Sequence, residues 1–437
     1  MGQAALGERR CIADMKITVV ETFGTGGLIH FSYQLCRALA DKGCKVKLLT
    51  SDDYELTSFP HNFSVEAFMH LWPSQDPTLM RIAPSSLSFR IWHKLRWTTR
   101  RTVRAIKFIW QWNRLTNRLL KERADIVQFS LIHFPFQAYF LSRLKRKGIL
   151  LTQICHEYEQ RDTKAGLISA LNRILSQKVY RSFSAIFFLA EDTRRDFHRF
   201  SGISSEHTYT IPHGDQSMFL VSQGQPLDMR SHYGLRNEDK VVLFFGNIRP
   251  SKGLPDLIEA YALLPKDANV KLLIVGSPTK HANMNEIQDM INAHNLHHSV
   301  IIDPRYIAME EVAPLMETAT LVVFPYRNAT QSGALHLAYS FGRPVIATKV
   351  GGLAEDVKDG QTGYLVPPES PVELAAAIAR LLNEPERLVQ MGIEARKLSQ
   401  SQHTWSAVAE RILSVYDELL FDTSAQQNHT SPVNTSQ

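Results

Sequence analysis

Cysteine is scarce in this chain of 437 residues, which contains only Cys11, Cys36, Cys44 and Cys155. The four lie far apart and lack the spacing of metal ligands, so we expect neither a disulfide scaffold nor a zinc site. Long apolar runs are missing as well. No segment approaches the length of a membrane-spanning helix, and no charged-then-apolar signal peptide opens the sequence. These absences favour a protein of the reducing cytoplasm.

Acidic side chains are almost absent from one stretch, although the whole chain has a net charge of only +6. Between Arg90 and Arg123, eleven Lys and Arg residues stand against the single Glu122. Aromatic residues are interleaved with them: Phe89, Trp92, Trp97, Phe108, Trp110 and Trp112. A cationic segment with aromatics is typical of contact with an anionic membrane. We therefore expect peripheral membrane contact through residues 89–123.

Two alternatives remain open for this segment. A solvated helix could pack Val103, Ile106, Ile109 and Trp110 into its own domain and leave its arginines in water. Nucleic acid is a further polyanion, but no nucleic-acid-binding motif accompanies the charge, so we expect no nucleic-acid partner.

The length suits two domains, and 44% hydrophobic residues can supply a core to each. Strands are predicted in the first half at residues 16–21, 45–50, 125–129, 149–155 and 185–189. Helices are predicted between them at residues 29–42 and 136–147, and after the last at 191–197. This alternation indicates a doubly wound domain. Gly24, Gly26 and Gly27 follow the first strand but lack the third glycine of the dinucleotide fingerprint.

The second half repeats the alternation. Its strands are predicted at residues 241–245, 270–275, 299–302, 321–324, 344–348 and 363–366. Its helices are predicted at residues 287–294, 310–317, 332–341 and 372–382. A polar stretch at residues 215–237 reads as the hinge. The predicted fold is α/β, with two doubly wound Rossmann-like domains at residues 15–228 and 229–404.

The two ends of the chain differ from this pattern. A last helix is predicted at residues 405–421. Residues 1–14 are expected to be a disordered leader, with Met15 as a possible true start. Residues 422–437 are rich in Ser, Thr, Asn and Gln and are expected to be a disordered tail.

An anion site is predicted after the strand at residues 241–245. The chain turns at Gly246, presents Arg249 and Lys252, and then enters a helix. Helix N–H groups, an arginine fork and a lysine point charge together suit phosphate. A solvated loop is the alternative.

A second helix N-terminus is predicted at residues 330–333, where Gln331, Ser332 and Gly333 follow Thr330. Ligands of doubly wound sheets bind at the carboxyl ends of the strands. Both anion sites should therefore face Gly26, Gly27 and His156 of the first half across a shared cleft, with His213 near the hinge. Two helix N-termini and two cations predict a diphosphate ligand. An ordinary N-cap at residue 332 and a core histidine at residue 156 are the alternatives.

The second half resembles the nucleotide-sugar domain of glycosyltransferase family 4, whose members are retaining enzymes with the GT-B fold. The resemblance rests on Gly-Asn-Ile-Arg-Pro-Ser-Lys-Gly at 246–253, Phe-Pro-Tyr at 324–326, Ser-Phe-Gly-Arg-Pro-Val-Ile-Ala-Thr at 340–348, Val-Gly-Gly-Leu-Ala-Glu at 350–355 and Asp-Gly-Gln-Thr-Gly-Tyr-Leu-Val at 359–366. The first half is similar through its glycine turn, His156 and Ile-Pro-His-Gly at 211–214.

The resemblance implies transfer of a sugar from a UDP-, GDP- or ADP-sugar to an acceptor hydroxyl, with retention of configuration, as in a hexosyltransferase. The acceptor would be a saccharide or a lipid-linked compound in cell-surface polysaccharide or glycolipid synthesis, and the enzyme would work at the inner face of the cytoplasmic membrane. The diphosphate would lie on Arg249 and Lys252 and near Ser332 and Gly333. His156 would lie beside the donor sugar. No cofactor or metal is implied, which fits the lack of an Asp-x-Asp motif.

One departure from the family concerns its two glutamates, which are eight positions apart in many members. Their positions here are Ala329 and Leu337. A branch of the family resembles this chain in having Ala-Thr-Gln-Ser-Gly at this place, so the site is interpreted as a variant. Gln331 and His336 are candidates to replace the glutamates. A non-catalytic nucleotide-sugar-binding homologue and a nucleotide-sugar epimerase of the same fold are the alternatives.

Overall fold

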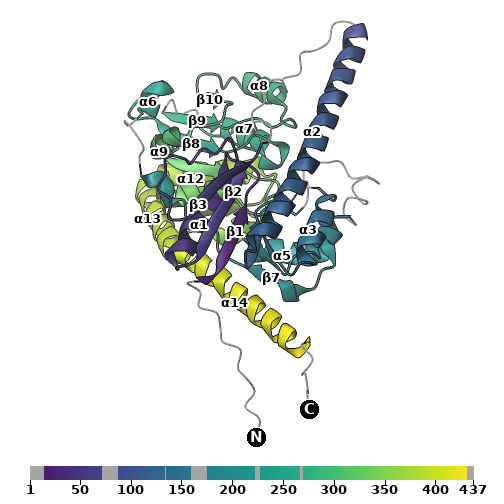
Figure 1. Ribbon diagram of the computed structural model, residues 1–437. Coiled ribbons are helices and arrows are strands. Elements are labelled where there is room, and N and C mark those ends of the chain that lie inside the picture. The colour runs from purple at the N-terminus through teal and green to yellow at the C-terminus, as the bar shows by residue number, and fades with distance from the viewer. Residues whose placement is uncertain are drawn as a thin grey trace, which may run out of the picture.

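Two parallel β-sheets, each flanked by helices, organise the chain (Figure 1). The computed structural model describes residues 14–70, 87–132, 134–158, 175–221, 227–265 and 269–430. The first sheet has the strand order β3-β2-β1-β4-β5-β6-β7, and the second has the order β10-β9-β8-β11-β12-β13. The predicted α/β fold with two doubly wound domains is confirmed. The predicted boundary between residues 228 and 229 stays a prediction.

The elements of the first half are β1 (Lys16–Val20), α1 (Gly27–Asp41), β2 (Lys45–Ser51), β3 (Ser64–Met69), α2 (Leu87–Glu122), β4 (Ile126–Phe129), α3 (Gln137–Lys145), β5 (Leu150–Cys155), β6 (Ala185–Phe188), α5 (Glu191–Ser201), η3 (Ser205–His207), β7 (Thr208–Thr210) and η4 (Ser217–Leu220). Those of the second half are α6 (Met229–His232), β8 (Lys240–Phe245), η5 (Pro250–Lys252), α7 (Leu254–Ala262), β9 (Val270–Val275), α8 (Met284–Ala293), β10 (Val300–Asp303), α9 (Met309–Thr318), β11 (Leu321–Phe324), α10 (Gly333–Ser340), β12 (Val345–Thr348), α11 (Gly351–Asp356), β13 (Gly363–Val366), α12 (Pro371–Asn383), α13 (Pro385–Gln402) and α14 (Trp405–Thr430).

The loops after β1 and β8 lie at the points where the strand order of each sheet reverses. β1 pairs with β2 on one side and β4 on the other. β8 likewise lies between β9 and β11. Ligands of doubly wound sheets bind at such switch points. After Lys240, β8 is a continuous apolar run, as expected of a strand covered on both faces, and residues 241–244 are at most 1% exposed.

Strand β3 is an element that the sequence did not predict. It is a short edge strand of six residues, and most of its side chains are partly or fully exposed. Its sequence, Ser-Val-Glu-Ala-Phe-Met, alternates only weakly between polar and apolar residues, so the strand signal was poor.

Helix α14 corrects a second expectation, because it runs from Trp405 to Thr430 rather than ending at residue 421. The predicted disordered tail is therefore wrong as far as Thr430. No Gly or Pro interrupts residues 422–430, and Ala425, Gln426 and Gln427 favour helix. The predictions for residues 1–13 and 431–437 lie outside the described residues.

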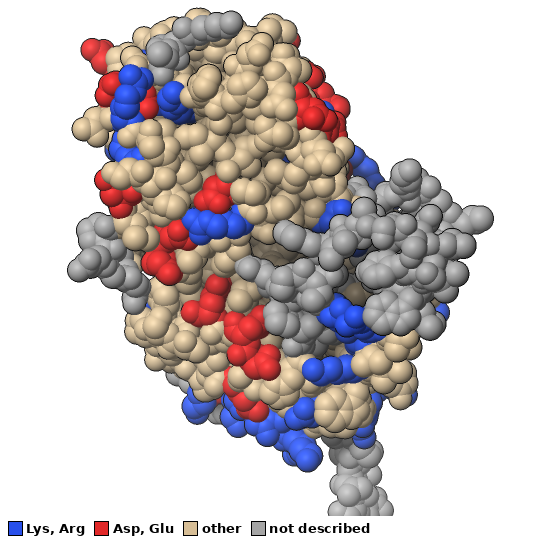
Figure 2. All heavy atoms as spheres, turned by 90° about the horizontal axis from the view of Figure 1, so that it is seen from above, with Lys and Arg blue, Asp and Glu red and all other residues tan. Residues whose placement is uncertain are grey.

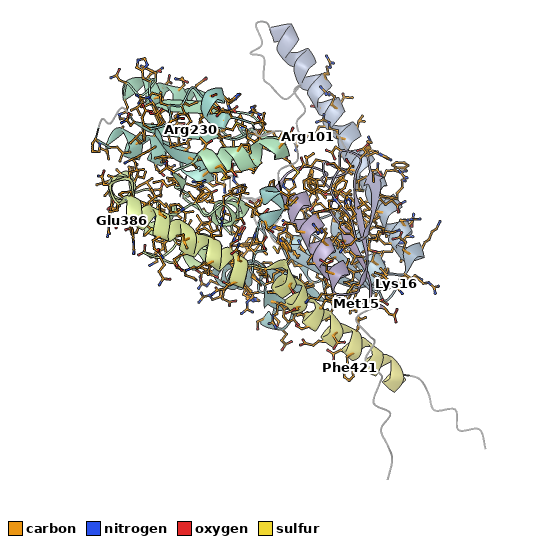
Figure 3. The ribbon with its side chains drawn as sticks, turned by 90° about the vertical axis from the view of Figure 1, so that its left-hand side faces the viewer. Met15, Lys16, Arg101, Arg230, Glu386 and Phe421 are labelled. Carbon is orange, nitrogen blue, oxygen red and sulfur yellow. The ribbon has the colours of Figure 1, made fainter. Side chains whose placement is uncertain are left out.

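Helix α14 also ties the second half of the chain back to the first (Figure 3). It packs against α1, and the Tyr416 hydroxyl reaches the side chains of Gln128 on β4 and, at 3.2 Å, Thr152 on β5. At its start the Trp405 indole N–H donates to the carbonyl of Asp215 over 2.9 Å. This returning helix therefore packs the end of the second half against the first half.

Helix α2 extends beyond the body of the molecule (Figure 1). Its last turns bury Trp112, Leu115 and Leu119 in the first domain. The alternative that Val103, Ile106, Ile109 and Trp110 pack into that domain is wrong, because they are between 45% and 63% exposed. Among the helices of the described ranges, none is long and apolar enough to cross a membrane.

Candidate active site

Arg249 and Lys252 lie between β8 and α7, where Arg249 immediately precedes the single turn η5 and Lys252 is its last residue. Gly253 ends that turn with a φ of 64°, which lets α7 begin at once. The Lys252 ammonium lies 3.5 Å from the ring centroid of Tyr326, which follows β11. The two predicted anion-binding loops are therefore adjacent in space.

The N-terminus of α10 contributes Gln331, Ser332 and Gly333. The Ser332 hydroxyl is paired with the Tyr326 hydroxyl at 3.2 Å and makes no capping bond to the helix. The alternative that the Ser332 side chain is an ordinary N-cap of α10 is therefore wrong. The Gln331 amide nitrogen is buried without a hydrogen-bond partner among the described residues, and Gly333 is exposed. Hydrogen-bond donors are therefore available at the N-terminus of α10, which is what the binding of an anion requires.

His156 follows β5 and reaches the same loop from the first domain. The Thr330 hydroxyl donates to the His156 carbonyl over 2.7 Å, and the His156 ring stacks edge-on against Phe31 of α1 at 4.9 Å. Its Nε2 is buried and has no hydrogen-bond partner among the described residues. Burial lowers the pKa of His156 to about 4, against a smaller opposing effect of Glu157, so the imidazole is neutral at pH 7.

Gly26 and Gly27 form the N-terminus of α1. Gly26 has a φ of 87°, which residues with a side chain rarely adopt, and no atom of the described residues lies within 4 Å of where a Cβ would be on either glycine. The space over this turn is open. The Gly26 N–H donates to Oε1 of Glu55 over 2.6 Å.

Two carboxylates of this region were missed by sequence reasoning. Glu157 is exposed and accepts a hydrogen bond from Arg249 over 2.8 Å. Glu55 lies between His30 and Tyr306, at 2.7 Å and 2.9 Å. No motif marks Glu55 in the sequence, because its partners come from α1 and from the loop after β10.

The positions of the family glutamates are buried. Ala329 is 6% exposed and Leu337 is 4% exposed. His336 is buried too, and its Nε2 lies 3.1 Å from Asp356. Its ring is stacked on that of His213 at 4.3 Å. Of the two predicted replacements, Gln331 is therefore the better placed.

Polar contacts hold the two domains together around these groups. Nε2 of His213 would lie 3.7 Å from a Cβ on Gly333. The Glu355 carboxylate accepts hydrogen bonds from the first two N–H groups of α5, at 2.9 Å and 2.5 Å. Beside Glu55, both domains and η4 line a cavity of about 340 Å³. Of the predicted residues, Lys252 lies beside the loop that leads to α10, and His156 is bonded to that loop through Thr330. Gly26 is linked to the second domain through Glu55 and Tyr306. That all of them form one donor site stays a prediction.

Two family models match the two domains in turn. Residues 25–214 match the model described as Glycosyltransferase Family 4, and residues 239–384 match the model described as Glycosyl transferases group 1. Together these matches cover most of the chain.

Curated relatives include an alpha-D-kanosaminyltransferase of Streptomyces kanamyceticus, 26% identical over 242 residues, which are 55% of this chain and 61% of the relative. A D-inositol 3-phosphate glycosyltransferase of Corynebacterium glutamicum (strain R) is 27% identical over 259 residues, which are 58% of this chain and 61% of the relative. The chain thus spans about three fifths of the length of these relatives.

Solved structures share the fold at low identity. Sucrose-phosphate synthase from Thermosynechococcus elongatus has a TM-score of 0.70 at 20% identity, with 93% of this chain and 99% of that one covered. Anabaena Alr3699/HepE in complex with UDP has a TM-score of 0.67 at 18% identity, with 92% of this chain and 100% of that one covered. The fold is therefore GT-B, and its two domains are similar in turn to the family 4 and group 1 glycosyltransferases.

Proposed function

We propose that this chain is a retaining, metal-independent glycosyltransferase that moves a sugar from a nucleotide-diphosphate-sugar to an acceptor hydroxyl. The observation that supports the proposal is that Lys252 lies over Tyr326, whose hydroxyl is paired with Ser332 at the start of α10, and that the same loop is bonded to His156 through Thr330. Two cations and two helix N-termini at one place suit a diphosphate.

The chemical task is to stabilise a departing diphosphate and an oxocarbenium-like sugar. Fixed cations and helix N–H groups do this best where water is excluded, since they need not reorient during the reaction. His156 is neutral, and in the described part of the chain its Nε2 has no hydrogen-bond partner, which suits a hydrogen bond to the donor sugar. The departing phosphate would take the proton of the acceptor hydroxyl. In this scheme His156 positions the sugar and does not act as the base.

The relatives support this chemistry by their descriptions, which include a kanosaminyltransferase and inositol-phosphate glycosyltransferases. The Anabaena structure, which shares the fold, has been solved with UDP and with UDP-glucose. A nucleotide-sugar donor follows by analogy. An acceptor in cell-surface polysaccharide or glycolipid synthesis is the substrate class that we propose.

A thermal-shift screen over UDP-, GDP- and ADP-sugars tests this function. We expect one nucleotide to raise the melting temperature, because a ligand that binds only the folded chain stabilises it. The same donor should then be consumed when saccharide or lipid-linked acceptors are added. Binding without consumption across a broad acceptor panel would favour a non-catalytic homologue. Release of an epimerised donor without acceptor would favour an epimerase.

We further propose that α2 contacts an anionic membrane. Val103, Ile106 and Trp110 are exposed and three or four residues apart, so they share one face of the helix. Lys107 and Arg114 flank that face, and residues 88–121 contain no Asp or Glu. Figure 2 shows a group of Lys and Arg side chains along the lower right edge of the molecule. Apolar side chains bordered by cations fit lipid headgroups. The side chains of residues 87–95 and 97 lie outside the described residues.

Charge reversal of Arg100, Arg101 and Arg104 to Glu should abolish sedimentation with vesicles that contain about 30% phosphatidylserine, because each cation near such a surface contributes about 1 kcal/mol of binding. The control reverses Arg387, Arg396 and Lys397 of α13, which lies across the molecule from α2 (Figure 3). It changes the net charge equally and should still sediment. Equal partitioning of both variants would show that α2 is not the contact.

A further inference from the structure

We propose that Thr330 is a positioning residue, whose hydroxyl fixes where His156 of the first domain lies relative to the start of α10 in the second. The inference rests on the proposed function, since it takes His156 as the residue beside the donor sugar. Thr330 acts through His156 and is given no contact with the donor.

The Thr330 hydroxyl donates a hydrogen bond across the domain interface. It reaches the carbonyl of His156 over 2.7 Å, and Thr330 is only 6% exposed. His156 directly follows Cys155, the last residue of β5 and the last that pairs with β6. A buried hydrogen bond from the second domain therefore holds the backbone of His156 just beyond the point where strand pairing ends.

The side chain of His156 is held by a different contact. Its ring packs edge-on against Phe31 of α1, with the two ring centroids 4.9 Å apart. The Nε2 atom of this ring is buried and has no hydrogen-bond partner in the part of the chain that the structure describes. Because the ring and the backbone are held separately, the direction of Nε2 depends on the Thr330 hydrogen bond as well as on Phe31.

The backbone of Thr330 is anchored independently of its own side chain. Its carbonyl accepts a hydrogen bond from the Gly352 N–H over 3.0 Å and another from the Thr193 hydroxyl over 2.8 Å. Thr330 stands three residues before Gly333, where α10 begins. The loop that leads to α10 should therefore stay in place when the Thr330 hydroxyl is removed, and the connection to His156 is then lost.

This connection matters because the proposed donor is held by both domains. Its diphosphate is assigned to the start of α10 and its sugar to His156, so the bond that breaks lies between groups on different domains. A displacement of about 1 Å in such an arrangement can lower the rate by about 10²-fold. Thr330 links the two groups through a single hydrogen bond.

Thr330→Val tests the inference, because valine has nearly the same shape and lacks the hydroxyl. The substrate is the nucleotide-sugar identified by the thermal-shift screen. We expect kcat to fall about 10-fold, as for the loss of one buried hydrogen bond that positions a reacting group. The affinity for the nucleoside diphosphate without its sugar, measured by calorimetry, should stay the same. Thr330→Ser keeps the hydroxyl and should restore most of the turnover.

Thr193→Val is the matched control. Thr193 is 5% exposed, and its hydroxyl also bonds across the interface, but to the Thr330 carbonyl and not to His156. Because Gly352 still donates to that carbonyl, this variant should keep its turnover. Equal losses of turnover in the two valine variants overturn the inference, since they would reflect a general loosening of the interface.

A double-mutant cycle with His156→Ala separates positioning from a structural role. If Thr330 acts through the His156 ring, Thr330→Val should have little further effect once that ring is absent. Additive losses overturn the inference and leave the proposed function intact. Normal turnover in His156→Ala overturns both the inference and the role of His156 in the proposed function. Melting temperatures check that each variant folds, and Thr330→Ala takes the place of a valine variant that does not.

Discussion

Replacing Arg249 and Lys252 together by alanine should lower turnover by about a thousandfold or more while the chain remains folded. Removing a single preorganised donor from a site of developing charge costs about 10²- to 10³-fold in turnover. Here both side-chain cations that we assign to the departing diphosphate are lost, so kcat should fall together with donor affinity. Steady-state kinetics with the donor identified by the thermal-shift screen will measure both.

The variant should fold because neither side chain belongs to a core. Arg249 makes a partly exposed ion pair with Glu157, and Lys252 lies over Tyr326. Contacts of these kinds contribute about 1 kcal/mol each. Alanine at Arg387 and Lys397 of α13 is the matched control, with the same loss of charge and no expected loss of turnover. Normal turnover in the double variant at residues 249 and 252 would disprove their assignment to the leaving group.

Much of the fold could be predicted because several strands, β8 and β11 among them, are apolar runs between turn residues. Residues 241–245 and 321–324 are predicted as strands, and the structure has them as β8 and β11 at almost the same bounds. The meeting of Arg249 and Lys252 with residues 331–333 then follows from topology, since the carboxyl ends of parallel strands share one edge.

The partners of the site residues could not be predicted in the same way. Glu55 and Tyr306 are 251 positions apart and meet only because the two domains close on each other. Glu157 stands beside a predicted site residue, yet nothing in its neighbours indicates that Arg249 will pair with it. Contacts across a domain interface depend on how the two sheets are placed relative to each other, and local sequence patterns do not predict that placement.

Helix α2 shows the limit of periodicity in a different way. Its sequence has apolar residues on more than one face, and either face could have entered the core. The structure buries Trp112 and Leu115 and leaves Ile106 and Trp110 in solvent. The choice depends on the shape of the sheet that the last turns cover, with Trp112 stacked on Phe129 of β4 at 5.8 Å.

Alanine at Gly253 should destabilise the chain strongly and remove activity, because this glycine is where the two anion-binding loops touch. A Cβ there would lie 1.8 Å from the carbonyl oxygen of Pro325, far inside van der Waals contact. The loops must then separate. Their separation would break the 2.9 Å hydrogen bond from the Arg327 N–H to the Ser251 carbonyl. Arg249 and Lys252 would move away from the N-terminus of α10.

Gly234 provides a control that separates this clash from backbone strain. It has a φ of 63°, against 64° for Gly253, but no atom lies within 4 Å of its Cβ position. Gly234→Ala should therefore show only the strain of a left-handed alanine, about 1–2 kcal/mol, with normal turnover. Gly253→Ala should cost several kcal/mol more in urea unfolding, since a backbone clash adds to the same strain. Equal losses of stability in the two variants would mean that the two loops can move apart freely, and donor binding would then have to bring them together.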